Sequence, residues 1–258
     1  MHTKTLFITG AAAGIGRETA KKFAYNGWFI GAADVDEVGL LSLKRDLGPD
    51  QCMTFVLDVT EPQQWQSALS DFFARTKRLD VLVNNAGILS SGPFTHTDFD
   101  KQGMIIDVNV KGVMAGCYYA HRYLAQTPHA CVVNLASASA IYGQPSLATY
   151  SASKFAVKGL TEALNLEWEE DDIRVIDMLP LFVATNMVTD MDAQSIRRLG
   201  VHLTADDVAQ EIFRAVQPGK SFSHVHWTVG KLTTLMYLAA NISPGWINRA
   251  VNRWITRR

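Results

Sequence analysis

The sequence predicts a doubly wound α/β domain, in which helices cover both faces of a parallel sheet. Two observations carry this prediction. Short apolar runs alternate with amphipathic segments from the start of the chain, and a glycine-rich turn joins the first run to the first helical segment. The 258 residues, 48% hydrophobic and 19% charged, are enough for one sizeable core. We therefore expect one domain over residues 1–258, with six to seven strands.

The strand predictions come first. Each strand is a nearly continuous apolar run, which is typical of strands buried on both faces. Six such runs are the number expected for the dinucleotide-binding Rossmann fold, and a seventh segment near the end is a further candidate. In order, they are Thr5–Ile8, Trp28–Ala33, Met53–Leu57, Leu79–Val83, Cys131–Leu135, Val175–Leu179 and His224–Val229.

Helical spacing fills the gaps between these runs. In the first gap, Ile15, Thr19 and Phe23 recur on one side of a helix, and the other gaps repeat apolar residues at similar intervals. The expected helices are Ile15–Gly27, Asp36–Leu47, Gln63–Arg75, Met104–Leu124, one that Tyr150 opens, and Ala205–Val216.

Composition excludes several classes of function. The net charge is −1, which leaves no basic surplus to bind nucleic acid. Cys52, Cys117 and Cys131 are an odd number without paired spacing and lie in apolar segments, which favours a reducing compartment. No His/Cys cluster has the spacing of metal ligands, and the first apolar run is too short for a signal peptide or a membrane span. We expect a cytoplasmic protein without a metal.

The turn Thr9–Gly16 has the context of a diphosphate-binding loop. Its glycines allow a sharp turn and a close approach of the backbone, and the N–H groups that begin the next helix favour an anion. The alternative is an ordinary tight turn with close helix packing.

Asp34 ends the second predicted strand, 18 residues beyond Gly16. A carboxylate there can accept hydrogen bonds from the adenosine ribose hydroxyls and would repel a 2′-phosphate. Because Ala13 and Val35 supply no cation for such a phosphate, NAD is favoured over NADP. The alternative is that Asp34 caps the helix beginning near Asp36.

Tyr150 and Lys154 lie four residues apart on one face of a predicted helix. A nearby ammonium favours the phenolate, so we expect Lys154 to pull the pKa of Tyr150 from roughly 10 toward neutrality. The phenol would then be a usable general acid and base. The pair alone also occurs by chance on solvated helices.

From Lys4 to about Met187, the chain resembles the short-chain dehydrogenase/reductase family. The shared features are the glycine spacing of Thr9–Gly16, the run Asn84–Gly87 after the fourth strand, an Asn in the long helix, and Tyr-x-x-x-Lys preceded thirteen residues earlier by a Ser. That spacing selects Ser137 over Ser139.

The resemblance implies a complete set of site residues. The catalytic residues would be Asn109, Ser137, Tyr150 and Lys154. The cofactor would be bound by Gly10, Ala12, Gly14, Ile15, Gly16, Asp34, Asp58, Val59, Asn85, Ala86, Gly87, Tyr150, Lys154, Val183 and Thr185. The substrate would contact Ser137, Ile141, Tyr142, Leu181 and Met187.

The implied reaction is hydride transfer between NAD(H) and a secondary alcohol or ketone. Tyr150 would exchange the hydroxyl proton, Ser137 would hold the substrate oxygen, and Asn109 would hold a water that links Lys154 to solvent. Apolar residues around these positions favour a hydrophobic substrate. The alternatives are an NADPH-dependent carbonyl reductase and a non-catalytic nucleotide-binding regulator, although the latter would be expected to lose the Ser, Tyr or Lys.

Two segments depart from the family pattern. Leu181 replaces a glycine in the turn before Thr185, and we expect that turn to keep an ordinary conformation with the leucine side chain against the pocket. Residues 1–187 would form the cofactor-binding and catalytic core, and residues 186–203 a lid over the substrate.

Residues 231–258 replace the usual ending of the family. They predict two helices separated near Ser243–Gly245, with Trp246 and Trp254 in one apolar stripe. We expect this stripe to pack on the protein's own body or on a second subunit, since the resemblance implies a homodimer or homotetramer. The alternatives are that it walls the substrate entrance or rests on a membrane surface.

Overall fold

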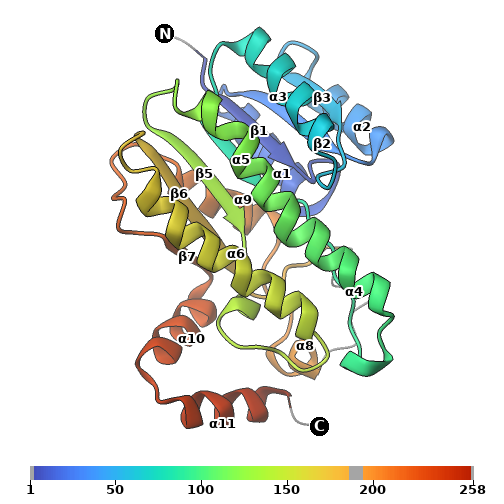
Figure 1. Ribbon diagram of the computed structural model, residues 1–258, viewed down its shortest axis with the longest axis vertical. Helices are drawn as coiled ribbons and strands as arrows, with labels where there is room; N and C mark the ends of the chain where they lie inside the picture. Colours follow the sequence, from blue (N-terminus) through green and yellow to red (C-terminus); the bar gives the residue numbers. More distant parts are fainter. Residues whose placement is uncertain (1–2, 186–193, 257–258) are drawn as a thin grey trace.

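A computed structural model describes residues 3–185 and 194–256 and contains a seven-stranded parallel sheet (Figure 1). The strand order is β3-β2-β1-β4-β5-β6-β7, so the chain reverses its direction of winding between β1 and β4. This confirms the doubly wound fold. The strands are β1 (Thr5–Thr9), β2 (Phe29–Asp34), β3 (Cys52–Val56), β4 (Val81–Asn84), β5 (Ala130–Leu135), β6 (Ile173–Pro180) and β7 (His226–Val229).

Burial explains why the strand sequences are so apolar. Every residue of β1, β4, β5 and β6 is buried, whereas the outer strand β7 alternates between half-buried and buried residues. The seventh predicted strand is therefore confirmed, with its start moved from His224 to His226.

Helices cover both faces of the sheet. One core joins a face of the sheet to α1, α2 and α9 through residues such as Phe23, Leu40 and Ile212, and the other joins the opposite face to α3, α5 and α6 through residues such as Trp65 and Val157. The helices with seven or more residues are α1 (Gly14–Tyr25), α2 (Glu37–Leu47), α3 (Pro62–Thr76), α4 (Phe99–Ile106), α5 (Gly112–Leu124), α6 (Ala148–Glu167), α9 (Ala205–Ala215), α10 (Lys231–Ile242) and α11 (Gly245–Thr256), and the shorter ones are η1 (Phe94–His96), η3 (Ala138–Ala140) and α8 (Gln194–Leu199).

The long helix expected over Met104–Leu124 is present, but it begins earlier, at Phe99, and is not α-helical throughout. A π-helical segment, η2 (Asp107–Lys111), separates α4 from α5, and Asn109 lies within it. The Asn109 side chain binds both backbone groups of Ile88, which fixes this segment against the loop after β4. Segments of this kind occur frequently at functional sites.

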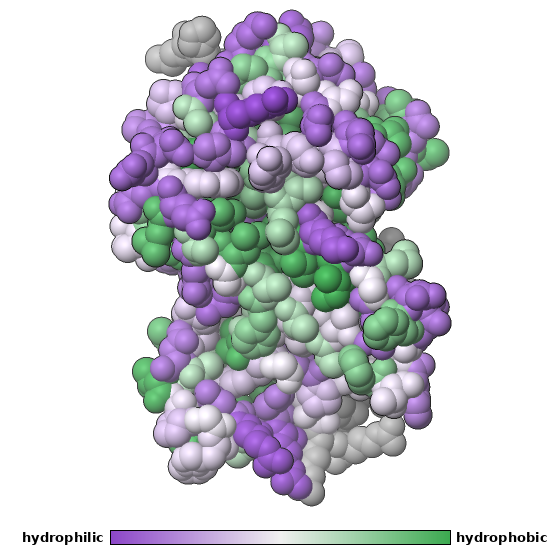
Figure 2. Space-filling view, in the orientation of Figure 1, coloured by the Kyte–Doolittle hydropathy of each residue, from purple (hydrophilic) through white to green (hydrophobic). Residues whose placement is uncertain are grey.

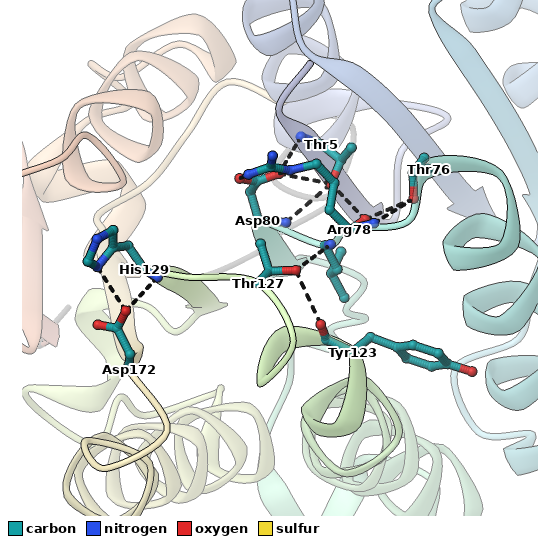
Figure 3. A network of polar contacts seen from close by, with 9 residues as sticks. Thr5, Thr76, Arg78, Asp80, Tyr123, Thr127, His129 and Asp172 are labelled. Atoms are coloured by element: carbon teal, nitrogen blue, oxygen red, sulfur yellow. Dashed lines mark hydrogen bonds and ion pairs between the residues drawn. The ribbon is translucent and has the colours of Figure 1, made fainter. Parts of the chain in front are cut away.

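A buried polar cluster connects neighbouring strands at their amino-terminal ends (Figure 3). The Asp80 carboxylate accepts hydrogen bonds from the Thr5 backbone N–H at 2.8 Å and from Arg78 Nε at 2.7 Å, and Thr127 Oγ1 accepts one from the Leu79 N–H at 3.0 Å. These bonds join the start of β1 to the segment before β4, so both strands reach the opposite edge in register.

The two predicted helices of the tail are α10 and α11. Figure 1 shows them at the end of the molecule away from α2 and α3, and Pro244 stands in the short break between them. Within the described part of the chain, no helix has both the length and the apolarity needed to cross a bilayer.

Candidate active site

A cavity of about 640 Å³ opens at the carboxyl ends of the strands. Loops after β1, β2, β3, β4, β5 and β6 line it, at the place where the strand order reverses and where open α/β sheets bind ligands. The predicted site residues on its wall are Gly10, Gly14, Ile15, Asp34, Asp58, Val59, Asn85, Ala86, Gly87, Ser137, Tyr150, Lys154, Leu181, Val183 and Thr185.

Five predicted residues do not line the cavity. Ala12 is buried behind the turn, and Gly16 lies inside it, where a β-carbon would stand 2.0 Å from the Gly10 carbonyl oxygen. Ile141 and Tyr142 are also absent from the wall, because the turn η3 leaves Ser137, Ala138 and Ser139 there instead. The fifth is Asn109. Met187 and the first part of the predicted lid, residues 186–193, fall outside the described residues.

The glycine turn has the geometry of an anion cradle. Gly10 and Gly14 have φ values of 67° and 53°, which favour glycine over any residue with a side chain. A β-carbon on Gly14 would lie 3.3 Å from Thr185, so a side chain at that position would fill the space between the turn and the loop after β6. The Asn85 amide donates to the carbonyls of Thr9 and Gly10 and holds the turn in place.

Asp34 connects the turn to the second strand. Its carboxylate accepts hydrogen bonds from the Ala12 N–H at 2.9 Å and the Asp36 N–H at 3.0 Å. The alternative role as cap of the next helix was wrong, because Asp36 itself caps α2 by accepting from the Gly39 N–H. Arg17, the nearest candidate for a phosphate-binding cation, is paired with Asp46 at 2.7 Å.

Ser137, Tyr150 and Lys154 meet on one side of the cavity. Ser137 follows β5, and its side chain is hydrogen-bonded to that of Tyr150 on α6. One turn along α6, Lys154 Nζ donates to the Leu135 carbonyl at 2.7 Å and lies 5.6 Å from the centre of the Tyr150 ring. Three side chains predicted to act together are therefore neighbours.

The charge states correct one expectation. Burial raises the pKa of Tyr150 above its ordinary value, and only the hydrogen bond with Ser137 opposes this effect. We had expected Lys154 to lower the pKa of Tyr150 toward neutrality. Burial instead lowers the pKa of Lys154 to about 8, because an ammonium is costly to remove from water.

Asn109 lies behind the cavity wall, where its side chain is hydrogen-bonded to Ile88 on the wall and to Ser153. Its side-chain oxygen accepts from the Ile88 N–H at 2.8 Å, and its amide donates to the Ile88 carbonyl at 2.9 Å and to Ser153 Oγ at 3.1 Å. Ser153 in turn donates to the Tyr150 carbonyl at 2.7 Å. Sequence reasoning missed Ser153, although its position one residue before Lys154 on the same helix was a usable signal.

Leu181 behaves as predicted. Its φ is not positive, and its half-buried side chain lines the cavity. Leu181→Gly is therefore expected to weaken binding of the nicotinamide cofactor by about fivefold, since it removes roughly 1 kcal/mol of apolar contact and loosens the turn. Titration of cofactor fluorescence measures this change. Complete unfolding of the variant, seen by circular dichroism, would contradict the account.

A glycine-rich turn facing a serine, a tyrosine and a lysine in one cavity defines a nucleotide-dependent oxidoreductase of the doubly wound class. Residues 4–196 match the short chain dehydrogenase family model. The chain therefore belongs to the short-chain dehydrogenase family, as its resemblance implied.

Individual members of the family are similar to this chain along most of its length. The chain is 30% identical to a cyclopentanol dehydrogenase from Comamonas sp. over 236 residues, which cover 87% of this chain and 94% of that protein. Two solved structures superpose with a TM-score of 0.81. One is a 3-ketoacyl-(acyl-carrier-protein) reductase from Brucella melitensis complexed with NADH, 27% identical, covering 88% of this chain and 97% of its own, and the other is ElxO with NADP bound, 25% identical, covering 92% and 99%.

Proposed function

We propose that this chain transfers a hydride between NAD(H) and a secondary alcohol or ketone with apolar substituents. The observation that carries the proposal is the meeting of Ser137, Tyr150 and Lys154 on the wall of the cavity that the glycine turn also lines. The space that a β-carbon on Gly14 would fill suits a diphosphate lying across the start of α1. When bound, the nicotinamide supplies the hydride donor or acceptor.

Side chains of this protein would carry out the proton transfer. Ser137 donates a hydrogen bond to the substrate oxygen and holds it beside the Tyr150 hydroxyl, which accepts the proton in oxidation and returns it in reduction. The Lys154 ammonium, one turn along α6, would hold the nicotinamide ribose beside the Tyr150 ring. A β-carbon on Gly87 would lie 3.7 Å from Lys154 Nζ and 3.2 Å from Asn109 Oδ1, so Asn109 stands where it can orient the surroundings of this amine.

Coenzyme preference provides a first test. Because Asp34 faces the cavity and, among the wall residues described, Lys154 is the only cation, we expect NAD to give at least a tenfold higher kcat/KM than NADP. Asp34→Asn, which removes the charge and keeps one acceptor oxygen, should narrow this preference by weakening repulsion of the 2′-phosphate. Steady-state kinetics with both coenzymes measure the effect. A tenfold advantage for NADP in the wild type would show that the alternative, an NADPH-dependent carbonyl reductase, is correct.

The substrate side of the cavity is apolar. Its wall includes Ile88, Leu89, Met104, Leu147 and Leu181, which favour a hydrophobic alcohol or ketone, in line with the cyclopentanol dehydrogenase relative. We further propose that the core over residues 1–187 works with residues 186–203 as its lid. The three cysteines are free and buried, which suits a cytoplasmic location.

Oligomer formation is proposed from one exposed face. Figure 2 shows hydrophobic side chains across the middle of the molecule, over α5 and α6. On these two helices, the exposed large side chains include Met114 and Tyr118 on α5 and Phe155 on α6. A pair of helices from each of two copies could cover these side chains, which favours a homodimer or a larger homo-oligomer.

A further inference from the structure

The helices α10 and α11 each expose large apolar side chains. On α10, Leu235, Leu238 and Ile242 are 65%, 57% and 85% exposed, and their spacing places them on one side of the helix. On α11, Trp246 and Trp254 are 73% and 64% exposed. We call these five residues the tail face. Of the predicted stripe, Trp246 and Trp254 are therefore not covered by the protein's own body, and packing on a second subunit stays a prediction.

The last part of the sequence, which carries the tail face, has only positive formal charges. Residues 212–258 contain seven Lys or Arg and no Asp or Glu. Since the whole chain has 24 cationic and 25 acidic residues, the first 211 residues have 17 against 25, a net charge of −8. The chain thus combines an acidic body with a basic ending.

Apolar and basic side chains are interleaved on α11. Trp246, Ala250 and Trp254 follow one another at intervals of four, and Arg249 and Arg253 lie beside this line on the same side of the helix. All five residues are exposed. This is the pattern of a helix that lies in the plane of a membrane interface, with aromatic rings at the acyl boundary and arginines at the headgroups.

Charge distinguishes among the possible occupants of this face. Two copies of the chain meeting through it would bring like charges together, because an isologous contact places the same patch on both sides. Nucleic acid has no apolar interior in which the exposed leucines could be buried, so it would complement only the charge of this face. A surface with negative headgroups above an apolar interior complements both properties.

The tail face also lies next to the cavity. Asn252 on α11 donates to the Gly143 carbonyl at 2.7 Å, and the next residue, Gln144, lines the cavity wall. On α8, the Arg198 guanidinium lies over the Trp254 ring and donates to the Trp254 carbonyl. The end of α11 is therefore attached to segments that flank the substrate site.

We propose that the tail face docks on a bilayer surface rich in anionic phospholipid. Apolar side chains enter the interface, and the basic residues pair with headgroups. The contact is peripheral. Resting on the proposed function, docking would bring the cavity close to a lipid phase in which apolar alcohols and ketones concentrate.

The test is co-sedimentation of the full chain with vesicles, which requires no turnover. Vesicles of phosphatidylcholine alone are compared with vesicles of equal parts phosphatidylcholine and phosphatidylglycerol. We expect binding to the anionic vesicles, at least tenfold weaker binding to the neutral ones, and release at high salt. Failure to bind while dehydrogenase activity is present would overturn this inference and leave the proposed function standing.

A charge variant and its control sharpen the test. Arg249→Glu/Arg253→Glu should weaken partitioning by at least tenfold, whereas Arg45→Glu/Arg75→Glu, which changes the net charge equally on exposed positions of α2 and α3, should have little effect. Equal losses from both pairs would show that net charge, and not the tail face, determines binding, which would refute the proposal.

An apolar pair tests the other half of the surface. Leu235→Gln/Ile242→Gln should reduce binding several-fold, and Val38→Gln/Leu166→Gln, at residues 76% and 72% exposed on other helices, should not. Sedimentation velocity of each variant without lipid tests the competing occupant. If Leu235→Gln/Ile242→Gln dissociates an oligomer and wild-type protein ignores the vesicles, the tail face is a subunit interface and the proposal is wrong.

Discussion

Replacing Tyr150 by Phe is expected to lower kcat by about a thousandfold while leaving the fold and cofactor binding intact. The phenol hydroxyl is hydrogen-bonded to Ser137 and could exchange the substrate proton, and general acid–base groups contribute roughly 10² to 10⁴ in rate. Steady-state kinetics with a hydrophobic ketone and reduced cofactor measure the loss, and cofactor fluorescence measures binding.

Tyr142 provides the matched control. It is a buried tyrosine after η3 that does not line the cavity, so Tyr142→Phe removes the same atom outside the proposed chemistry. We expect its kcat to remain within about twofold of wild type. Similar rates in the two variants, whether both high or both low, would show that Tyr150 is not the proton-transfer group.

Removing the Lys154 amine is expected to change both activity and the pH dependence of stability. Lys154→Met should lower kcat/KM by at least a hundredfold, because the amine that would hold the nicotinamide ribose beside Tyr150 is lost. The pKa of Lys154 in the folded chain is about 8, below its ordinary value of 10.5. Between these two values, the unfolded chain therefore binds a proton that the folded chain has released.

The sign of the stability effect follows from this difference. The free energy of unfolding of the wild type gains roughly 3 kcal/mol from Lys154 as pH rises from 8 to 10.5, and Lys154→Met lacks this gain. Urea unfolding of both proteins at pH 7 and pH 10.5 measures it as the difference between their pH dependences. Lys158→Met, one turn further along α6 at a residue paired with Glu162, serves as control. A constant difference between wild type and Lys154→Met would contradict the buried position of the amine.

The strands could be read from the sequence because burial on both faces leaves little choice of residue. β1 and β6 are buried along their whole length, and their sequences are correspondingly apolar. The order of the motifs likewise indicated which loops would meet, because the carboxyl ends of parallel strands share one edge. Ser137 was found through its spacing from Tyr150 rather than through its own surroundings.

Local packing explains what sequence could not show. The π-helical segment around Asn109 depends on the fit of one amide against Ile88, and apolar spacing is blind to one extra residue in a helical turn. Spacing placed Lys154 beside Tyr150, but burial, which spacing does not report, reversed the expected pKa shift of the phenol. Residues 141 and 142 were assigned to the substrate by resemblance, which did not predict η3 and its placement of Ser137, Ala138 and Ser139 on the wall instead.

In the tail, the sequence likewise predicted the helices but not the exposure of their side chains. Pro244 indicated where α10 ends and α11 begins, but helical spacing cannot distinguish an apolar stripe that is covered from one that is exposed. Only the exposure of Ile242 and Trp246 in the folded chain made that distinction.

Transfer of deuterium tests the central claim most directly. The protein is incubated with NADH deuterated at the transferable position of the nicotinamide and a panel of apolar ketones, and the alcohols formed are analysed by mass spectrometry. We predict one deuterium on the carbinol carbon with wild-type protein and almost none with Tyr150→Phe. Unlabelled alcohol, or equal labelling by the two proteins, would contradict hydride transfer assisted by Tyr150.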